Sequence, residues 1–597
     1  MTILQALTHY YERMAMQGII EPLGYSRENI SACIWLNKYG GVVKIDDLNA
    51  YNKKKPEPRR MAVPSAINRT SGVASNFLWD KTAYVLGIGL GKDKKTIDFF
   101  EKQHAAFKQL HQQRLAGTKD DGLLALLAFL DQWKAADFES LNGFTKDMLD
   151  KNIIFGFIDE EMTYLHDRSA SQALITAPAE VWKTGMCLVT GQEGPIERLH
   201  PVIKGVDGGQ TSGARIVSYN ADAFTSYGKE DGANAPTSVQ AAFKYGTALN
   251  RLLDREGGKR MKLGDSSVVF WADATLYGED AAKAAETYID ITANPPDNLQ
   301  ENQKLRNVMK QIREGQPLSA IHPDLHAQTQ FYILGLSPNA ARISIRYWLV
   351  DEFGHFAKNL AKHFENIEIT PAPWGEKLPS LWLLLVKTTA LMEKTENIPN
   401  QLAGDVARAV FSGQPYPRTL LQAAIMRLRA GDSPRWGWHA AIIKACINRI
   451  AKKEEELPVS RRIDYPDVSY QLGRLFATLE SAQYAALGKI NASITDRFYG
   501  AASSTPARAF PALLRNGRHH ISDVRKREPE KGRWIETRLD EIFEKLPPTF
   551  PKTLNLEEQG RFAVGYYHER AWRSPAQKNA PQDQSDTQDA NKTGDEA

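Results

Sequence analysis

The pattern of apolar residues changes along the chain, and this change limits the possible folds more than any other feature. Before about residue 350, short β-branched runs such as Val42–Ile45 alternate with glycine-rich turns, which is typical of strands. From about residue 400, apolar side chains recur at the spacing of an amphipathic helix, as in Leu472, Leu475, Phe476 and Leu479. We therefore expect an α+β protein, with a mixed α/β N-terminal region containing β-sheet and helices, followed by a C-terminal helical bundle.

Three segments follow from this pattern: an α/β region over residues 1–400, a bundle over 401–573 and a tail over 574–597. The tail is rich in Gln, Asp and Asn and has no aromatic residue, so we expect it to be disordered. Its net charge is −3, whereas the whole chain of 597 residues carries +4 and the part before the tail carries +7. This mild basicity permits a nucleic-acid partner without requiring one.

Several classes of protein are excluded by composition. Hydrophobic residues make up 42% of the chain, which is normal for a globular protein, and no apolar run approaches the ~20 residues of a membrane span. The first residues do not resemble a signal peptide, so we expect a cytoplasmic protein with no membrane partner. Cys33, Cys187 and Cys446 are too far apart in sequence to suggest a disulfide framework or a cysteine zinc site.

Two catalytic motifs are only partly matched. Gly87–Lys92 resembles a phosphate-binding loop, but its spacing is wrong and Asp93 stands where the hydroxyl residue should be. The dipeptide His166-Asp167 is found in metal phosphohydrolases, which need further ordered ligands. We therefore predict no catalytic residue, no metal and no cofactor, and keep a metal-dependent phosphohydrolase or nuclease using His166-Asp167 as the alternative.

Three segments have the composition of nucleic-acid contacts. Residues 58–81 and 204–220 combine cations with glycine and with short polar side chains that can hydrogen-bond to bases. Residues 501–527 carry a net charge of +5 in a helical pattern, which suits a sugar–phosphate backbone. A hairpin is also predicted at Ile333–Leu336 and Ala341–Leu349, with Ile343, Ile345 and Tyr347 on one apolar face.

Five separated stretches carry a family resemblance. The sequence resembles the large subunit of the type I-C CRISPR surveillance complex, Cascade. The stretches are Arg69–Gly87; Gly208–Asn220 with Asn234-Ala-Pro and Ala241-Ala-Phe; Leu334–Arg346; Asp496–Pro506; and Leu556–Arg570.

The resemblance implies a subunit that is not an enzyme. Such subunits recognise a protospacer-adjacent motif in duplex DNA, promote duplex opening and R-loop formation, hold the displaced strand and help to recruit a helicase-nuclease in antiviral defence. The implied partners are CRISPR RNA, target double-stranded DNA, its displaced single strand, and the backbone, CRISPR-RNA endonuclease and small subunits. The small subunit would come from an internal translation start, for which Val459 and Val468 are candidates.

Site residues are assigned on this basis as hypotheses. Opening also needs a wedge or loop between the strands, which the sequence does not identify. A scaffold that contacts only protein partners is a further alternative. The residues assigned to the motif region are Arg69, Thr70, Ser71, Asn76, Gln210, Thr211, Ser212 and Asn220, and those assigned to the displaced strand are Arg508, Arg515, Arg518, Arg525, Lys526 and Arg527.

Overall fold

The chain forms two compact units, each built from two separate segments. In the computed structural model, the first unit is Met1–Val202 with Val217–Arg251, and the second is Ile203–Ile216 with Leu252–Ala597. The predicted tail, 574–597, lies outside the described residues, and the predicted boundary at residue 400 stays a prediction. The structure describes all residues except 53–54, 68, 70–71, 159–160, 177–181, 256–258, 264–265, 341, 393–396, 489 and 573–597.

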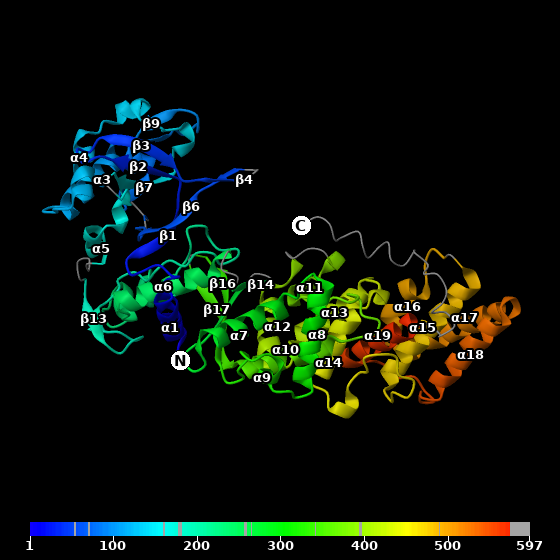
Figure 1. Cartoon of the computed structure of the whole chain (residues 1–597). Helices are drawn as coiled ribbons and strands as arrows, with labels where there is room; N and C mark the ends of the chain where they lie inside the picture. Colours follow the sequence, from blue (N-terminus) through cyan, green and yellow to red (C-terminus); the bar gives the residue numbers. More distant parts are fainter. Residues whose placement is uncertain are drawn as a thin grey trace. The chain divides into compact units, whose positions relative to one another are not determined.

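A five-stranded mixed sheet is the centre of the first unit (Figure 1). Strand β2 is buried on both faces. Ile34 packs towards α3 (Glu101–Arg114) and α4 (Asp121–Gln132), whereas Cys33 and Trp35 face a second core with β1 (Tyr25–Ile30) and β6 (Arg59–Pro64). The sheet order is β11-β10-β2-β3, with β7 also paired to β10. The strands of this sheet are β2 (Ala32–Leu36), β3 (Val42–Asp47), β7 (Trp79–Lys81), β10 (Asn152–Phe157) and β11 (Thr163–Tyr164).

Short strand pairs and helices complete the first unit. Its paired strands outside the sheet are β1 (Tyr25–Ile30) with β6 (Arg59–Pro64), β4 (Ala50–Asn52) with β5 (Lys55–Glu57), β8 (Ile88–Leu90) with β9 (Ile97–Phe99), and β12 (Thr184–Met186) with β13 (Glu193–Pro195). Its helices are α1 (Ile3–Met16), α2 (Thr82–Val85), α3 (Glu101–Arg114), α4 (Asp121–Gln132), α5 (Ser169–Thr176) and most of α6 (Val239–Leu253).

The second unit begins with an antiparallel four-stranded sheet of order β14-β15-β16-β17. One face of it is apolar and packs on helices, with Phe270, Phe331 and Tyr347 in the same core as Phe353 and Phe356 of α10. The strands are β14 (Arg260–Leu263), β15 (Ser266–Ala272), β16 (Gln330–Asn339) and β17 (Arg342–Glu352).

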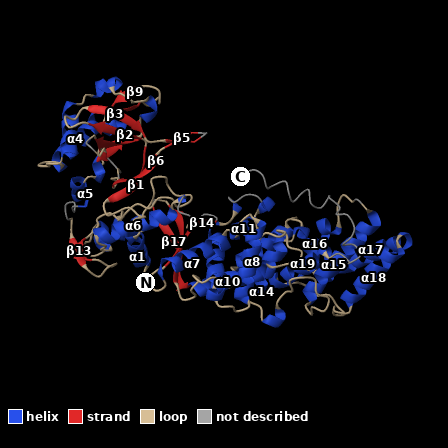
Figure 2. Cartoon of the chain, in the orientation of Figure 1, coloured by secondary structure: helices blue, strands red, loops and turns tan. Residues whose placement is uncertain are grey.

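Helices dominate the rest of the second unit (Figure 2). This confirms the predicted α+β class, with sheets in the N-terminal part and a helical C-terminal part. No helix among the described residues is both long and apolar enough to cross a bilayer. The helices are α7 (Gly278–Ala293), α8 (Leu299–Arg313), α9 (Leu318–Ile321), α10 (Phe353–Ile367), α11 (Leu381–Val386), α12 (Asn400–Ser412), α13 (Arg418–Arg429), α14 (Trp438–Asn448), α15 (Val468–Leu487), α16 (Ile494–Ser504), α17 (Pro506–Arg527), α18 (Pro529–Phe543) and α19 (Leu556–Ala571).

The predicted hairpin is present as β16 and β17, but its apolar face was predicted wrongly. A β-bulge shifts the register, so Gly335 pairs with Tyr347 while the next residue, Leu336, pairs with Ile345. The bulge therefore places Tyr347 and Ile345 on opposite faces of the sheet. Tyr347 is buried in the main core and Ile345 is exposed.

Helices α15 and α19 are in backbone contact at two glycines. A Cβ atom added to Gly473 would lie 2.0 Å from the Phe562 carbonyl oxygen, and one added to Gly565 would lie 2.1 Å from the Tyr470 carbonyl oxygen. Arg474, which is fully buried on α15, donates a hydrogen bond of 2.7 Å to Glu569 on α19. The two glycines let the helix backbones touch, and the ion pair fixes their register.

We expect Gly473→Ala and Gly565→Ala to destabilise the protein by about 2–3 kcal/mol each, because the added methyl group meets backbone that cannot move aside. Gly500→Ala in α16 is the matched control: its Cβ would have open space, so stability should stay constant or rise by up to ~1 kcal/mol. Urea unfolding measures all three variants. Equal stability of the three would contradict this account of the contact.

Candidate nucleic-acid interface

The glycine-rich loop at residues 203–216 is attached to the β16–β17 hairpin. Ile203 and Ala214 form an antiparallel bridge, with hydrogen bonds of 2.8 and 3.0 Å, and this bridge closes the base of the loop. The loop then pairs with the start of β17, where the Ile343 amide donates to the Arg215 carbonyl at 3.1 Å. Two stretches that are far apart in the sequence, and that both carry the resemblance, therefore meet within the second unit.

Asp207 fixes the loop to the sheet from the other side. Its amide donates to the Ser267 hydroxyl at 2.9 Å, and that hydroxyl donates back to the Asp207 carboxylate at 2.9 Å. The same carboxylate forms an ion pair with Arg260 of β14, and both side chains are largely buried. Strands β14 and β15 thus hold the loop in addition to β17.

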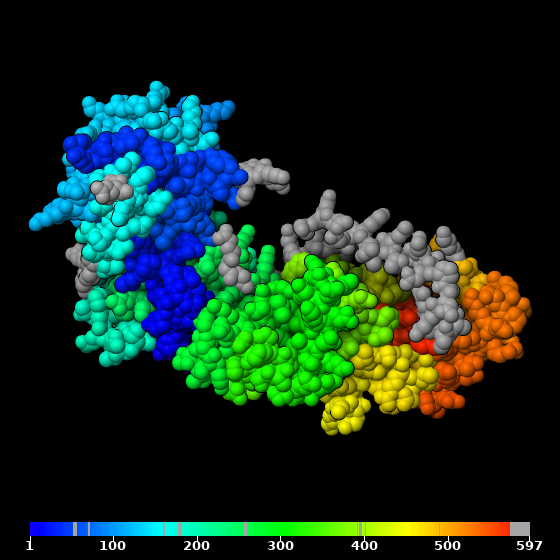
Figure 3. All heavy atoms as spheres, in the orientation of Figure 1, coloured from blue at the N-terminus to red at the C-terminus, as the bar shows by residue number. Residues whose placement is uncertain are grey.

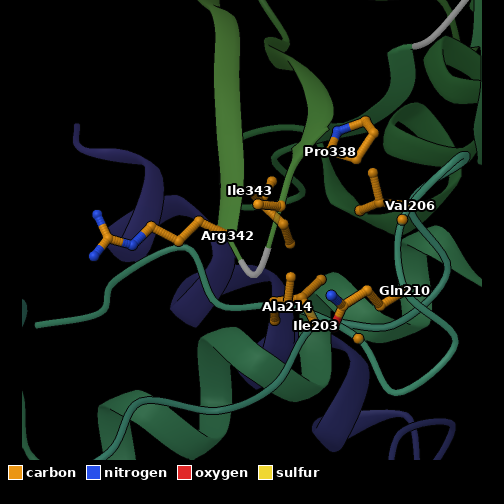
Figure 4. A pocket seen from close by; sticks show the side chains of 10 residues that line it. Ile203, Val206, Gln210, Ala214, Pro338, Arg342 and Ile343 are labelled. Atoms are coloured by element: carbon orange, nitrogen blue, oxygen red, sulfur yellow. The ribbon is translucent and has the colours of Figure 1, made fainter. Parts of the chain in front are cut away.

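The small pocket between the loop and the hairpin is a packing seam (Figure 4). Val206, Ala214, Pro338 and Ile343 line it with apolar surface. Its volume is about 10 Å³, compared with the ~300 Å³ or more of small-molecule sites, so no such ligand fits there.

The tip of this loop presents polar side chains to solvent. Gln210, Thr211 and Ser212 are exposed, and the turn closes with a 2.8 Å hydrogen bond from the Gly213 amide to the Gln210 carbonyl. Gly213 has a φ of +83°, a conformation that suits glycine. The structure therefore brings three of the predicted site residues together on a fixed support. Asn220 is also exposed but belongs to the first unit.

Helix α17 has a cationic face opposite its buried face. At ideal helix geometry, Arg508, Arg515 and Lys526 fall within about 20° of each other around the helix axis and extend over about 27 Å, with Pro511 inside this helix. The opposite side packs inward through Phe510, Leu513 and Gly517. The helix is at the surface of the second unit, in the orange region of Figure 3.

The six predicted cations of α17 differ in their contacts. Arg525 forms an ion pair of 3.2 Å with Glu536 of α18, and Arg527 donates to the Ala486 carbonyl. Within the described part of the chain, no ion pair is formed by the other four, which we call the α17 cation stripe: Arg508, Arg515, Arg518 and Lys526.

In the first unit, Arg69 and Asn76 hold the loop that contains them. Arg69 donates to the Ala74 carbonyl at 2.7 Å, forms an ion pair with Asp80 and lies over the Tyr84 ring. Asn76 is 5% exposed, and its side-chain oxygen accepts from the Ile67 amide at 3.0 Å. Both residues shape the loop, and their part in reading a motif stays a prediction. Thr70 and Ser71 lie outside the described residues.

His111 supports the end of the same loop from α3. It is fully buried, its Nε2 accepts from the Leu78 amide at 2.8 Å, and its Nδ1 is 2.7 Å from the Phe107 carbonyl. These contacts require the neutral ring, with the proton on Nδ1. Burial lowers the pKa of His111 to about 4.

His166 is buried beside an exposed Asp167. Its Nε2 is 3.7 Å from the Asp167 carboxylate, and its ring stacks on Tyr164. Burial is the main cause that lowers its pKa. Nowhere in the described part of the chain do three or more His, Cys, Asp or Glu side chains gather as a possible metal site.

A comparison with protein families shows which family the chain belongs to. The family model for the CRISPR-associated protein Cas_Csd1 matches residues 7–574, nearly the whole length. The chain belongs to the Csd1 family. The resemblance predicted from the five stretches is thereby confirmed, and the protein is a CRISPR-associated protein. No curated protein matches the chain.

Sequence reasoning missed the residues that support the loop in this Csd1-family chain. Asp207, Arg260 and Ser267 were not singled out, although Asp207 directly precedes the quoted stretch that begins at Gly208. The alternation of charges around Arg342 was noted only as a strand pattern. An aspartate directly before the glycine pair Gly208-Gly209 is the sequence signal that could have indicated an anchor.

His111 makes the first unit of the Csd1-family protein sensitive to acid. The pKa of His111 is lower in the folded chain than in the unfolded chain, so the unfolded state takes up the proton first. We therefore expect the contribution of His111 to the free energy of unfolding to be complete above about pH 6.5 and to fall as the pH drops towards 4, by up to about 3 kcal/mol.

The test is urea unfolding of the full chain at pH 7 and pH 4.5, followed by hydrogen exchange in peptides around Leu78. His111→Gln keeps an acceptor for the Leu78 amide but cannot be protonated in this range. Its free energy of unfolding should therefore fall less between pH 7 and pH 4.5 than that of the unchanged protein. The same loss in both proteins would show that His111 is not the cause.

Proposed function

We propose that this chain is the large subunit of a type I-C Cascade. It recognises a protospacer-adjacent motif in duplex DNA, promotes opening of the duplex and R-loop formation, holds the displaced strand and helps to recruit a helicase-nuclease. Base pairing by CRISPR RNA supplies the sequence specificity in this division of labour, so the subunit itself needs no catalytic residue and no cofactor. Family membership and the distribution of charge support this proposal.

The observation that carries the proposal is the α17 cation stripe. Its four exposed cations lie on a single helix and have no counter-ion among the described residues, so they are free to neutralise phosphates along a strand. A scaffold that contacts only proteins has no need of such a stripe. The displaced strand is an extended polyanion without base-pairing partners, and it fits a cationic surface about 27 Å long.

The loop tip Gln210–Ser212 is the proposed reader of the motif. Amide and hydroxyl groups can donate to and accept from base edges in a groove. The support from Asp207, Ser267 and β17 keeps these groups in a fixed position, which lowers the entropy cost of binding. Arg69 and Asn76 also shape their own loop, and their assignment to the motif region stays a prediction.

We expect Arg515→Ala with Arg518→Ala to weaken binding of single-stranded DNA about tenfold and to reduce the salt dependence of binding by about 1.4 in slope. The loss should be similar for all DNA sequences. The matched control is Arg525→Ala with Arg527→Ala, which removes the same charge from the same helix but affects side chains already engaged, so its effect should be smaller. Titrations of the full chain with single-stranded DNA at several salt concentrations measure the affinity and its salt dependence for both double variants. Equal losses of affinity in the two variants, or no loss in either, would contradict the assignment.

Substitution of the loop tip should change specificity rather than overall affinity. For Gln210→Ala with Ser212→Ala, we expect the assembled complex to lose about 10-fold or more of its preference for motif-bearing duplex over a duplex with a changed motif. The Arg515/Arg518 variant should keep that preference. If the loop-tip variant discriminates as the unchanged protein does, the motif is read elsewhere.

A further inference from the structure

The α17 cation stripe lies close to the point where residues 573–597 begin. Helix α18 touches the end of α17, since a Cβ atom added to Gly532 would lie 2.7 Å from the Arg525 Cα atom. Trp534, two residues further along α18, stacks on Trp572 with ring centroids 6.1 Å apart. Trp572 is therefore separated from the end of α17 by little more than the width of one helix, about 10–12 Å with side chains.

Trp572 is firmly held in the second unit. The guanidinium of Arg538 lies 3.6 Å from the centroid of its ring, and that of Arg461 lies 4.7 Å away. Both arginines form ion pairs with the buried Glu569, at 3.4 and 2.7 Å. Arginines that are themselves held in place fix an aromatic ring between them. The place from which residue 573 continues is thus fixed relative to α17.

Residues 583–597 carry five acidic side chains and one basic side chain, a net charge of −4. The first three acids are spaced by three residues, which corresponds to about 10 Å in an extended chain. The segment has no aromatic or large aliphatic side chain, so charge dominates its interaction with a surface. The acids are Asp583, Asp586, Asp589, Asp595 and Glu596, and the base is Lys592.

The cations of the stripe have a similar spacing. Along the helix axis, Arg508 and Arg515 are about 10 Å apart, and Arg518 and Lys526 are about 12 Å apart. Asp523 is the single acid in the sequence of α17, so this helix has a large excess of positive charge. Opposite charges at matching intervals favour an extended acidic chain along the stripe.

The connection between Trp572 and the acids is long enough to reach the stripe. Asp583 is eleven residues beyond Trp572, so the connection spans at most about 36–40 Å, several times the width of a helix. Attachment through a short linker gives the acids an effective concentration in the millimolar range. Ion pairs that are too weak to form between separate molecules therefore form within the chain, and salt weakens them.

We propose that residues 583–596 lie along the α17 cation stripe when no nucleic acid is bound there, and compete with nucleic acid for it. This contact regulates the site described above, so its consequence rests on the proposed function. A strand has one charge per nucleotide and thus a higher charge density than the segment. A strand that the complex holds nearby displaces the segment, whereas dilute nucleic acid in solution does not.

The first experiment titrates the full chain with single-stranded DNA. The variant Asp583→Asn with Asp586→Asn and Asp589→Asn should bind about 3- to 10-fold more tightly than the unchanged protein at about 50 mM salt, because the competitor has lost its charge. The gain should disappear at about 500 mM salt, where the ion pairs are screened. Ser585→Ala with Gln588→Ala is the matched control in the same segment and should leave the affinity unchanged.

Two further measurements locate the contact. In a chain that carries Arg515→Ala and Arg518→Ala, neutralising the three acids should improve affinity by less than about twofold, because the partners of the acids are gone. A carbodiimide couples a lysine to a carboxylate that contacts it. Mass spectrometry should find Lys526 joined to an acid of residues 583–596 in the same chain, and excess single-stranded DNA should suppress this product.

The outcomes separate a failure of this inference from a failure of the proposed function. An unchanged affinity of the neutralised variant would overturn the inference, and so would the absence of the Lys526 product. An equal gain in the Arg515/Arg518 background would overturn it by indicating general repulsion of DNA. A Lys526 product that joins only isotope-labelled to unlabelled chains would overturn it in favour of a second copy. If neither the unchanged chain nor the neutralised variant binds single-stranded DNA, the proposed function fails, whereas the Lys526 product still tests the contact.

Discussion

The direct backbone contact between α15 and α19 determines how the helical part of the second unit is arranged. With glycine at 473 and 565, each helix approaches the carbonyl groups of the other, and the buried pair of Arg474 and Glu569 excludes alternative registers. Helix α17 then packs on α15, where Gly517 leaves room for Leu479. The cation stripe is consequently directed to solvent by packing on its other side, without any contribution from the cations themselves.

Two kinds of polar surface differ in how they are supported. The loop at 203–216 presents short side chains on backbone that three strands hold, which suits a ligand that must be distinguished by small differences in hydrogen bonding. The stripe on α17 presents long flexible side chains from a regular helix, which suits a ligand whose charge is uniform. The rigid loop matches what base contacts require, and the flexible stripe matches what phosphate contacts require.

Much of the fold could be predicted from periodicity. The stripe at 472–479 corresponds to α15, and the alternating residues after Ala341 correspond to β17. The bulge at Gly335/Leu336 could not be predicted, because a one-residue shift of register leaves no trace in the alternation of a single strand. It was enough to reverse the predicted exposure of Ile345.

The site was predicted less completely, because a side chain's role depends on partners distant in sequence. Charge counting found the cations of α17, but only the fold shows that Arg525 faces Glu536. Composition likewise assigned Asn76 to the motif region, which stays a prediction, and only the fold shows that its side-chain oxygen accepts from the Ile67 amide inside the loop. Asp207 was missed since its partners Arg260 and Ser267 come from strands that follow a helix.

The order of the loop and its supporting strands along the chain determines when the loop can become ordered during translation. The loop at 203–216 leaves the ribosome before any strand that supports it, and its last support, Ile343, is made only after β14, β15 and β16. Domains generally fold as units during translation, starting from the N-terminus. A chain that ends before the hairpin therefore has the polar residues of the loop but not their fixed arrangement. An ordered loop is consequently a marker of a chain that has been translated through β17.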